Sequence, residues 1–455
     1  MQDLSRTVSS NEILKQIKDL LPQRTYLVGG CIRDMLLGRV PPDFDLVTYE
    51  PVEDLAARIA DRLGARPFWM DERRRVIRIA LKSLSANIDV SEPKALSIEE
   101  DLRSRDLTIN AMAYDLSRHR LIDPLDGFHD LSRGVIRIIS EENLLNDPLR
   151  GLRAVRFSVT LDFAVHEESS RMIKRHAWRL NKVSGERIRQ EIVQALRTVH
   201  GADFFRQLTW NALVPVLFAP YFPEQDNGDD HQHALLLSVV PVCQELDGII
   251  YACDALMPDC SGILAQETES GVERGALLRL ASFLLGLEEL RSENHKGRES
   301  GIPARDRSVE DRAMDFCSSL RFSARSSRTI RSLLGRVERT QRFLAQRAPS
   351  PLDIHRFCED TAEQLPEALL LSLSRVKTQE ALPRQTVARV WEYYRTTYQE
   401  HKKSPLISGS DVIDVLGGGA GPEVGKWLRT IEEARARGEI RTRSEAMEFL
   451  RRKIG

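Results

Sequence analysis

The stretch from Val28 to Leu46, VGGCIRDMLLGRVPPDFDL, limits the fold of the N-terminal part of the chain more than any other segment. An apolar run ends in two glycines, a short amphipathic segment follows, and two aspartates then alternate with apolar residues. This order predicts a strand, a tight turn, a short helix and a second strand. Because alternate side chains of a strand share a face, we expect Asp43 and Asp45 to lie on one side of a sheet.

These residue types are suited to binding a metal and a phosphate. Two carboxylates on one face can share one or two Mg²⁺ ions, which prefer oxygen ligands and often a substrate phosphate. Gly29 and Gly30 allow the backbone to approach a phosphate closely, with a helix N-terminus directly after them. Asp89, in the predicted strand NIDVS, could complete the site. Two glycines before a helix are also a common turn, and two aspartates at this spacing also occur by chance. These residues alone therefore leave open whether the segment is a metal and phosphate site or an ordinary turn between strand and helix.

The character of the chain changes near residue 140. Before this point predicted strands (TYLV, FDLV, RVIRIAL, NIDVS) alternate with predicted helices (CIRDMLLG, VEDLAARIADRLG). After it, helical periodicity dominates, as in ERIRQEIVQALRTV and ARVWEYYRTTYQEH. We therefore expect an α+β head followed by an all-α remainder. The 455 residues exceed what one core organises, and the polar segment 292–311 is the predicted loop or linker.

The composition limits which cellular compartment and which binding partners we expect. The six cysteines form no CxxC pair, which argues against a zinc site or a disulfide framework and favours a reducing compartment. The N-terminus carries no secretion signal, and no apolar run reaches the roughly 18 residues of a membrane span, so we expect a cytoplasmic protein. The net charge is −1, but residues 150–200 hold eleven Lys and Arg against five Asp and Glu. This local excess is suited to contacts with RNA phosphates, and amphipathic helices with solvated charged faces show the same pattern without binding RNA.

Several segments, in order, resemble the motifs of class II tRNA nucleotidyltransferases and bacterial poly(A) polymerases. The opening stretch resembles their polymerase-β-type nucleotidyltransferase head. EEDLRSRDLTINAMAYD resembles the ribose-recognising motif, DPLDGFHDLSRGVIRII the hinge, NDPLRGLRAVRFSVTLDF the nucleobase-selecting helix, GERIRQEI the neck motif, and PLISGSDVIDVLGGGAGPEVGKWL the tail. The resemblance implies a head over residues 1–139, a neck with the nucleobase-selecting helices over 140–200, a helical body over 201–350 and a tRNA-binding helical tail over 351–455.

The resemblance also implies an activity and its residues. The activity is transfer of CMP and/or AMP from CTP or ATP to the 3′ end of tRNA without a nucleic-acid template, with release of pyrophosphate. Asp43 and Asp45 would bind Mg²⁺, and Asp89 would complete the catalytic carboxylates. The partners implied are the tRNA acceptor arm and 3′ end and CTP and/or ATP, with neither membrane nor DNA. The implied nucleotide-binding residues are Gly29, Gly30, Arg33, Arg105, Asp106, Asn110, Asp147, Arg150, Arg153 and Arg156.

The resemblance also implies that Asp147 and Arg150 select the base of the incoming nucleotide. They are three residues apart, which places them on one face of a helix, where an acceptor and a forked donor can pair with the Watson–Crick edge of a base. Arg153 continues this face. The same spacing of Asp147 and Arg150 would also suit an ordinary salt bridge on a solvated helix. For Arg105 and Asp106, the alternative to nucleotide binding is a surface ion pair. Asn146 stands where the family has an acidic residue, which bears on how this helix is anchored.

The subtype depends on a missing segment. Only nine residues, VSEPKALSI, separate Asp89 from Glu99, and none is Arg or Gly. Family members that add all of CCA carry a flexible loop with Arg and Gly here, and its loss is associated with enzymes that add CC and stop. The sequence therefore favours CC addition. The alternatives are full CCA addition, A addition, poly(A) polymerisation and an RNA-binding relative without catalysis; the long helical body counts against a small-molecule nucleotidyltransferase.

One region of the body resembles the helices of an HD phosphohydrolase domain, namely DDHQHALLLS followed by LLRLASFLLGLEE. Leu285 and Gly286 stand where the HD pair is expected, and neither side chain can ligate a metal. We therefore expect a degenerate HD-like fold without hydrolase activity, with His231 and His233 as loop or surface residues.

Overall fold

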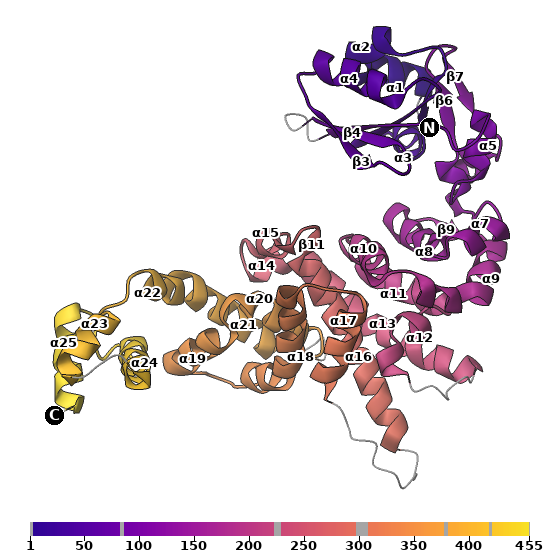
Figure 1. The fold of residues 1–455 in the computed structure, drawn as a ribbon. Helices are drawn as coiled ribbons and strands as arrows, with labels where there is room; N and C mark the ends of the chain where they lie inside the picture. Colours follow the sequence, from indigo (N-terminus) through magenta and orange to yellow (C-terminus); the bar gives the residue numbers. More distant parts are fainter. Residues whose placement is uncertain are drawn as a thin grey trace. The chain divides into compact units, whose positions relative to one another are not determined.

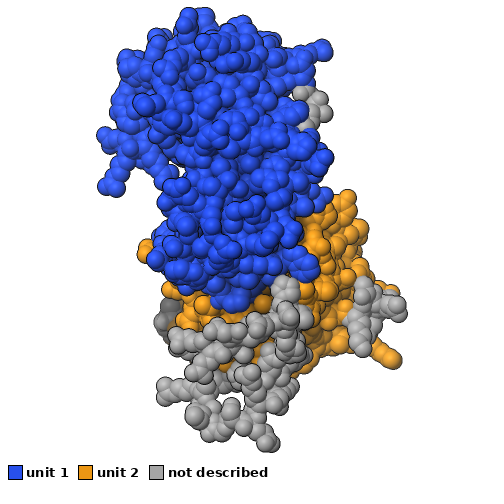
Figure 2. Space-filling view, turned by 90° about the vertical axis from the view of Figure 1, so that its right-hand side faces the viewer, with its two compact units in different colours: residues 1–195, 207–217 blue, residues 196–206, 218–455 orange. Residues whose placement is uncertain are grey.

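The computed structural model describes residues 3–81, 86–222, 229–296, 308–376, 381–417 and 421–454. The chain divides into two compact units (Figure 2). The first unit contains residues 1–195 and 207–217, and the second contains residues 196–206 and 218–455. In the described part of the chain no helix is long and apolar enough to cross a membrane.

The first unit is built on a seven-stranded sheet with the order β3-β4-β5-β2-β1-β6-β7 (Figure 1). β2 and β5 pair in parallel, and all other neighbours in this sheet are antiparallel. A short parallel pair, β8 with β9, lies outside it. The strands are β1 (Thr25–Val28), β2 (Asp43–Thr48), β3 (Pro67–Asp71), β4 (Val76–Leu81), β5 (Ala86–Ser91), β6 (Ala113–Asp115), β7 (Arg120–Ile122), β8 (Val135–Ile136) and β9 (Ala164–Val165).

Short helices surround the sheet and lead into the neck region that follows it. The helices are α1 (Leu4–Ser10), α2 (Glu12–Ile17), η1 (Lys18–Leu20), α3 (Gly30–Leu36), α4 (Val52–Arg62), α5 (Ile98–Arg103), η3 (Thr108–Asn110), α6 (Gly127–Arg133), α7 (Glu141–Asn146), α8 (Leu149–Leu161), α9 (Glu167–His176), η4 (Ala177–Lys182), α10 (Gly185–Leu196), α11 (Gly201–Trp210) and α12 (Val214–Leu217).

The sheet places its apolar side chains inward by simple alternation. Phe44 and Leu46 on β2 are buried. Asp43 and Asp45, which alternate with them along the strand, are partly exposed on the other face. α4 buries Val52, Leu55 and Ile59 as one stripe and packs on β4 and β5. Each fully buried side chain of this kind contributes about 1.5–3 kcal/mol, so β2 is held firmly while its polar face remains available.

The connection after β5 is short and tied down. Residues 92–97 join β5 to α5. The Ser97 hydroxyl accepts a hydrogen bond from the Glu100 amide (3.2 Å) and caps α5, and the Asp101 carboxylate accepts one from the Lys94 amide (2.9 Å). The short segment predicted between Asp89 and Glu99 is therefore an ordered turn with its polar groups engaged.

The second unit is helical except for a two-stranded ribbon. Together with the sheet of the first unit, this confirms the predicted α+β head followed by a mostly helical chain. Its elements are η5 (Ala219–Tyr221), α13 (Asp229–Tyr251), α14 (Cys253–Leu256), α15 (Cys260–Leu264), β10 (Glu267–Glu269), β11 (Val272–Glu273), α16 (Arg274–Lys296), α17 (Val309–Ser319), α18 (Ala324–Leu344), α19 (Pro351–Thr361), η6 (Ala362–Gln364), α20 (Leu365–Leu373), α21 (Ala381–Tyr393), the π-helical turn η7 (Tyr394–Tyr398), α22 (Gln399–Lys403), α23 (Gly409–Leu416), α24 (Pro422–Ala436) and α25 (Arg443–Ile454).

Aromatic stacking organises the core of the second unit. Phe205 stacks on Phe283 with ring centroids 4.0 Å apart, and Phe218 stacks on Phe316 at 4.8 Å. Phe218 also meets the Phe283 ring edge-on at 5.0 Å, which joins the two pairs into one cluster. All four side chains are buried. The cluster ties α11, α16 and α17 together.

Gly286, one of the two residues at the expected HD position, has a packing reason. α16 packs along α13, and a Cβ added at Gly286 would lie 2.2 Å from Cγ1 of Val239. Only glycine allows the two helices to come this close. The side chains of His231 and His233 lie outside the described part of the structure. The predicted linker 292–311 begins in α16 and ends in α17, and its residues 297–307 also lie outside the described part.

We predict that Gly286→Ala destabilises the second unit by about 1–3 kcal/mol, because the added methyl group must displace Val239. Gly248→Ala is the matched control: Gly248 lies exposed in α13 with nothing within 4 Å of its added Cβ, and alanine there should be neutral or stabilising by up to about 1 kcal/mol. Thermal unfolding followed by circular dichroism measures both, and equal melting temperatures for the two variants would contradict the packing role.

Candidate active site

Three aspartates meet where β2 and β5 run side by side. In the parallel register Asp45 lies opposite Asp89, and Asp43 lies opposite Asn87. Partners in register point to the same face of a sheet, so the carboxylates of β2 and β5 are close neighbours. The Asn87 side chain donates a hydrogen bond to Asp43 (2.8 Å). The structure thus brings together the three carboxylates predicted as catalytic.

The electrostatics of Asp45 favour the binding of a cation. Burial raises its pKa to about 6, the negative charges of Asp89 and Asp43 contribute to this rise, and Arg105 and Arg78 act in the opposite direction. Carboxylate oxygens are the ligands that hard divalent cations prefer, and a cation here would relieve this repulsion. The residues present therefore fit a divalent metal.

The protein offers such a cation an incomplete set of ligands. Among the described residues, no three His, Cys, Asp or Glu side chains are arranged to hold a metal ion by themselves. A cation bound by Asp43 and Asp45 would take further oxygens from water or from phosphate groups. This arrangement is suited to a metal that arrives with, and contacts, a nucleotide.

A fourth charged residue that the sequence did not single out completes this cluster. Arg78 on β4 lies directly opposite Asp89 in the antiparallel register. Its Nε and Nη2 atoms each donate to one oxygen of Asp89, both at 2.7 Å. This is a bidentate arginine–carboxylate pair, the strongest geometry that such a pair adopts. No local sequence pattern predicts it, because Arg78 and Asp89 meet only through strand pairing.

The glycine turn lies against these carboxylates. Gly29 has φ = +77°, and a Cβ there would lie 3.0 Å from Nη1 of Arg105 and 3.6 Å from Oδ2 of Asp45. The backbone conformation favours glycine, and the approach of Arg105 is tighter than most Cβ atoms allow, whereas the distance to Asp45 is an ordinary contact. α3 begins at Gly30 and carries the buried Arg33. The predicted glycines, Arg105 and the carboxylates thus form one continuous site.

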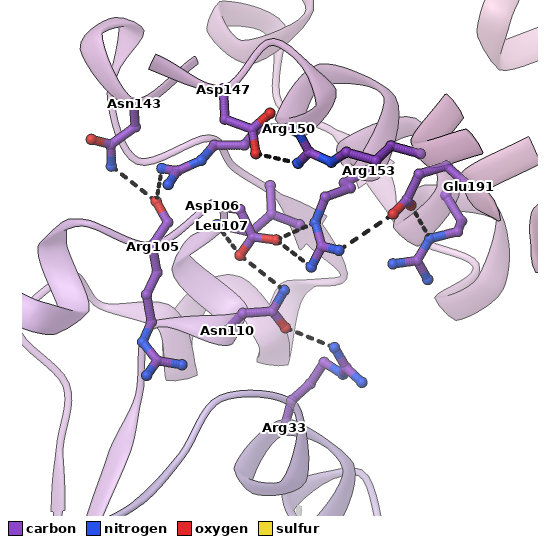
Figure 3. A network of polar contacts seen from close by, with 12 residues as sticks. Arg33, Arg105, Asp106, Leu107, Asn110, Asn143, Asp147, Arg150, Arg153 and Glu191 are labelled. Carbon is purple, nitrogen blue, oxygen red and sulfur yellow. Dashed lines mark hydrogen bonds and ion pairs between the residues drawn. The ribbon is translucent and has the colours of Figure 1, made fainter. Parts of the chain in front are cut away.

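A buried polar network extends from α3 to the neck (Figure 3). Arg33 donates to the Asn110 side chain (2.7 Å), and Asn110 donates to Asp106 (3.2 Å). Arg153 donates to the other oxygen of Asp106 (2.8 Å) and to Glu191 (3.3 Å). The network therefore links α3, η3, α8 and α10.

Charge pairing keeps Asp106 ionised in this network. Burial alone would raise the pKa of Asp106, but the charge and hydrogen bonds of Arg153, with those of Asn110 and the Leu107 amide, bring the pKa below its ordinary value. Asp106 is thus a member of a buried network, and Arg105 pairs separately with Asp101 (3.1 Å). The alternative of an Arg105–Asp106 surface ion pair is wrong.

Glu191 is the second residue that sequence reasoning missed. It is buried on α10 and accepts hydrogen bonds from both Arg153 (3.3 Å) and Arg156 (2.5 Å). The segment GERIRQEI that contains it resembled a family motif, but no residue of it was assigned a role. The excess of arginines on α8 was the available signal, since a buried guanidinium such as that of Arg156 needs a carboxylate partner.

The predicted geometry of Asp147 and Arg150 is wrong. Asp147 is not helical: it caps the end of α7 with φ = −141° and ψ = 94°, and α8 begins only at Leu149. The cause is Pro148, because a proline disfavours the helical conformation of the residue before it. Asp147 accepts a hydrogen bond from Arg187 (2.7 Å), whereas the Arg150 guanidinium donates to the carbonyl oxygens of Arg105 (2.5 Å) and Ser104 (2.8 Å).

Comparisons with known proteins identify the class to which this chain belongs. The family model described as poly A polymerase head domain matches residues 25–137, which contain the sheet, the glycine turn and the carboxylates. A second model, tRNA nucleotidyltransferase domain 2, matches residues 307–450. The matched domains are those of a nucleotidyltransferase.

Relatives that match over nearly the whole chain refine this class. A CC-adding tRNA nucleotidyltransferase of Geobacter sulfurreducens is 30% identical over 94% of this chain and 91% of its own length. An A-adding tRNA nucleotidyltransferase of Deinococcus radiodurans is 29% identical over 95% and 96%. The chain belongs to the family of class II tRNA nucleotidyltransferases and bacterial poly(A) polymerases.

Solved structures share the fold. A CCA-adding enzyme in complex with ATP aligns with a TM-score of 0.71 at 21% identity, covering 100% of this chain and 99% of that chain. The Thermotoga maritima CCA-adding enzyme in complex with tRNA aligns with a TM-score of 0.66 at 20% identity, again covering 100% and 99%. The arrangement of sheet and helices described above is therefore that of known tRNA-processing enzymes.

We predict that Asp45→Asn stabilises the metal-free protein at neutral pH. Since the folded-state pKa of Asp45 is raised to about 6, ionisation opposes folding, and wild-type stability falls as pH rises from about 4 to about 6. The variant avoids this loss of roughly 2–3 kcal/mol. In EDTA its melting temperature should exceed that of wild type by a few degrees at about pH 8, with the difference vanishing near pH 4. A constant difference at all pH values would contradict this.

We predict that Arg153→Met destabilises the first unit by about 2–3 kcal/mol, because it leaves the Asp106 carboxylate, whose side chain is only 12% exposed, without its main partner. Arg187→Met is the matched control: it removes an arginine whose side chain is 47% exposed from its pair with Asp147, and should cost less than about 1 kcal/mol. Urea unfolding followed by circular dichroism separates the two, and similar losses would show that the network is not energetically special.

Proposed function

We propose that the protein adds CMP from CTP to the 3′ end of tRNA, stops after CC, and uses Mg²⁺. The short connection of residues 92–97, tied through Asp101, carries this proposal. By the family resemblance, full CCA addition relies on a flexible loop at this place to reshape the pocket for ATP. The similarity to the CC-adding enzyme of Geobacter sulfurreducens supports the proposal. The similarity to the A-adding enzyme of Deinococcus radiodurans makes A addition the main alternative.

The contacts of Asp101 support a connection that does not reshape the pocket. One oxygen of Asp101 accepts from the Lys94 amide (2.9 Å), and the other accepts from the Arg105 guanidinium (3.1 Å). Arg105 in turn lies against Gly29, beside Asp45. The same buried carboxylate thus holds the connection and a residue of the site, so a large movement of one would break the other.

The chain's own residues would position the reactants. The turn at Gly29 and Gly30, with Arg33 and Arg105, would take the triphosphate, and Asp106 with Asn110 the ribose. Asp43 and Asp45 would hold Mg²⁺, which activates the 3′ hydroxyl and balances the charge of the departing pyrophosphate. Asp89 completes the negative face beside them. The transfer then needs orientation and charge balance from the protein more than covalent chemistry.

Asp147 and Arg150 would read the incoming base, supported by Arg153 and Arg156. One oxygen of Asp147 accepts a hydrogen bond from the Leu149 amide (3.3 Å), and the other pairs with the exposed Arg187, a pair that exchanges at little cost. Arg150 donates to two backbone carbonyls, so it must turn from Ser104 and Arg105 to meet a base. The buried Arg153–Glu191–Arg156 cluster holds α8 in place during this exchange.

The proposal predicts a specific pattern of nucleotide incorporation. Purified protein with Mg²⁺ is given tRNAs that end at the discriminator base, after C, and after CC, with labelled CTP or ATP separately. We expect two CMP residues on the first tRNA, one on the second, and no AMP on the third. AMP incorporation on the CC-ended tRNA would overturn CC-only specificity in favour of full CCA or A addition.

We predict that the double variant Asp43→Ala/Asp45→Ala lowers CMP incorporation by at least about 10³-fold while tRNA binding persists, because the metal ligands are lost and the helical units are unchanged. Asp61→Ala, at an exposed position of α4, is the control and should keep full activity. Gel-based extension and filter binding measure the two properties. Retention of activity in the double variant would contradict the assignment of the metal ligands.

A further inference from the structure

Asp89 differs from its neighbours in one respect: both of its oxygens are already engaged. Arg78 donates to Oδ1 and to Oδ2, each at 2.7 Å, and the two side chains are largely withdrawn from solvent. Among the described residues, no side chain donates a hydrogen bond to Asp45, and Asp43 accepts one from the neutral Asn87. Of three carboxylates on one face, only Asp89 is neutralised by a bidentate partner.

The pairing is fixed by the sheet itself. Arg78 and Asp89 face each other in the β4–β5 register, and Asp89 faces Asp45 in the β5–β2 register. Since strand register allows no sliding where one face is buried, positions 78 and 89 stay side by side in the folded sheet. The guanidinium therefore needs no backbone movement to pair with Asp89 in the ligand-free site.

We propose that Arg78 is a positioning residue that keeps Asp89 out of the metal's set of ligands. The site then offers a divalent cation the carboxylates of Asp43 and Asp45, and leaves coordination positions and positive charge for a nucleotide phosphate. Without Arg78, Asp89 becomes a third carboxylate ligand, and the cation binds more tightly before the nucleotide arrives. This inference rests on the proposed metal site at Asp43 and Asp45.

The physical reason is the balance of charge at the site. A divalent cation held by two carboxylates is formally neutral, and the phosphates of CTP bring further negative charge that it must attract. A third carboxylate on the cation would make the site negative and repel the nucleotide. Arg78 offsets the charge of Asp89 and also engages one lone pair on each of its oxygens, so both the charge and the coordination number stay suited to a metal–nucleotide complex.

Binding of Mn²⁺ alone, without nucleotide, tests this directly. Electron paramagnetic resonance or calorimetry gives the Kd for wild type, Arg78→Met, Asp89→Asn and the double variant Arg78→Met/Asp89→Asn. We expect Arg78→Met to lower the Mn²⁺ Kd by about tenfold or more, and Asp89→Asn alone to raise it, because the charge of Arg78 is then unopposed. In the Asp89→Asn background the effect of Arg78→Met should be markedly smaller, because only the charge of Arg78 is removed and no carboxylate is released to the cation.

The competing explanation is that Arg78 acts only by repelling the cation. In that case Arg78→Met lowers the Kd equally in both backgrounds, which would overturn the inference. An unchanged Kd in Arg78→Met would do the same. Arg78→Lys keeps the charge but loses the bidentate fork, so we expect it to tighten Mn²⁺ binding measurably; wild-type affinity in this variant would support repulsion alone.

Two controls keep the outcome interpretable. Circular dichroism melting shows whether each variant is folded, and Arg78→Lys, which retains the stem packing and the charge, serves if Arg78→Met does not fold. Mn²⁺ binding that survives Asp43→Ala/Asp45→Ala at wild-type affinity would overturn the proposed metal site, and this inference with it. Binding that is lost in that variant but is insensitive to Arg78 would overturn this inference alone.

Discussion

The parallel pairing of β2 with β5 is the interaction on which the site depends. It sets Asp45 beside Asp89 in a partly buried position, where two negative charges repel each other. The burial of Phe44 and Leu46 on the opposite face holds this arrangement in place. The sheet therefore keeps a carboxylate cluster that is unfavourable by itself, and the unfavourable charge is what makes the cluster a cation site.

The rest of the head is arranged around this charge. Gly29 brings the backbone and Arg105 close to Asp45, and Arg78 neutralises Asp89 from the other side. Farther out, Asp106, Arg153 and Glu191 connect the phosphate side of the site with α8, the helix that begins beside the residues assigned to the base. Because these ionic groups are buried and mutually satisfied, the two sides of the site are held in one geometry.

The local sequence pattern was sufficient to predict features that depend on a single segment of the chain. Alternation along β2 predicted that Asp43 and Asp45 share a face, and the loss of strand signals near residue 140 predicted the change from sheet to helices. β3 was missed, because PFWMD is exposed along most of its length, shows no alternation and begins with proline, as edge strands can.

Features that depend on pairing between distant segments could not be predicted in this way. The partners of Asp89 and Arg153 come from strands and helices whose register no short pattern reveals, so Arg78 and Glu191 were overlooked. The error at Asp147 was of another kind: helical spacing was applied across Pro148, although a proline forces the residue before it out of the helix. In this case the conformational restriction before a proline could be inferred from the sequence, and it outweighs the helical spacing of Asp147 and Arg150.

The central claim is that Asp43 and Asp45 hold the metal that receives the nucleotide. A crystal structure with Mn²⁺ and a non-hydrolysable CTP analogue tests it most directly, because Mn²⁺ is located by its anomalous scattering. We predict a Mn²⁺ peak bound by the Asp43 and Asp45 carboxylates and by the phosphates of the analogue, with the triphosphate against Gly29 and Gly30. A nucleotide bound there with its Mn²⁺ away from both carboxylates would contradict the account.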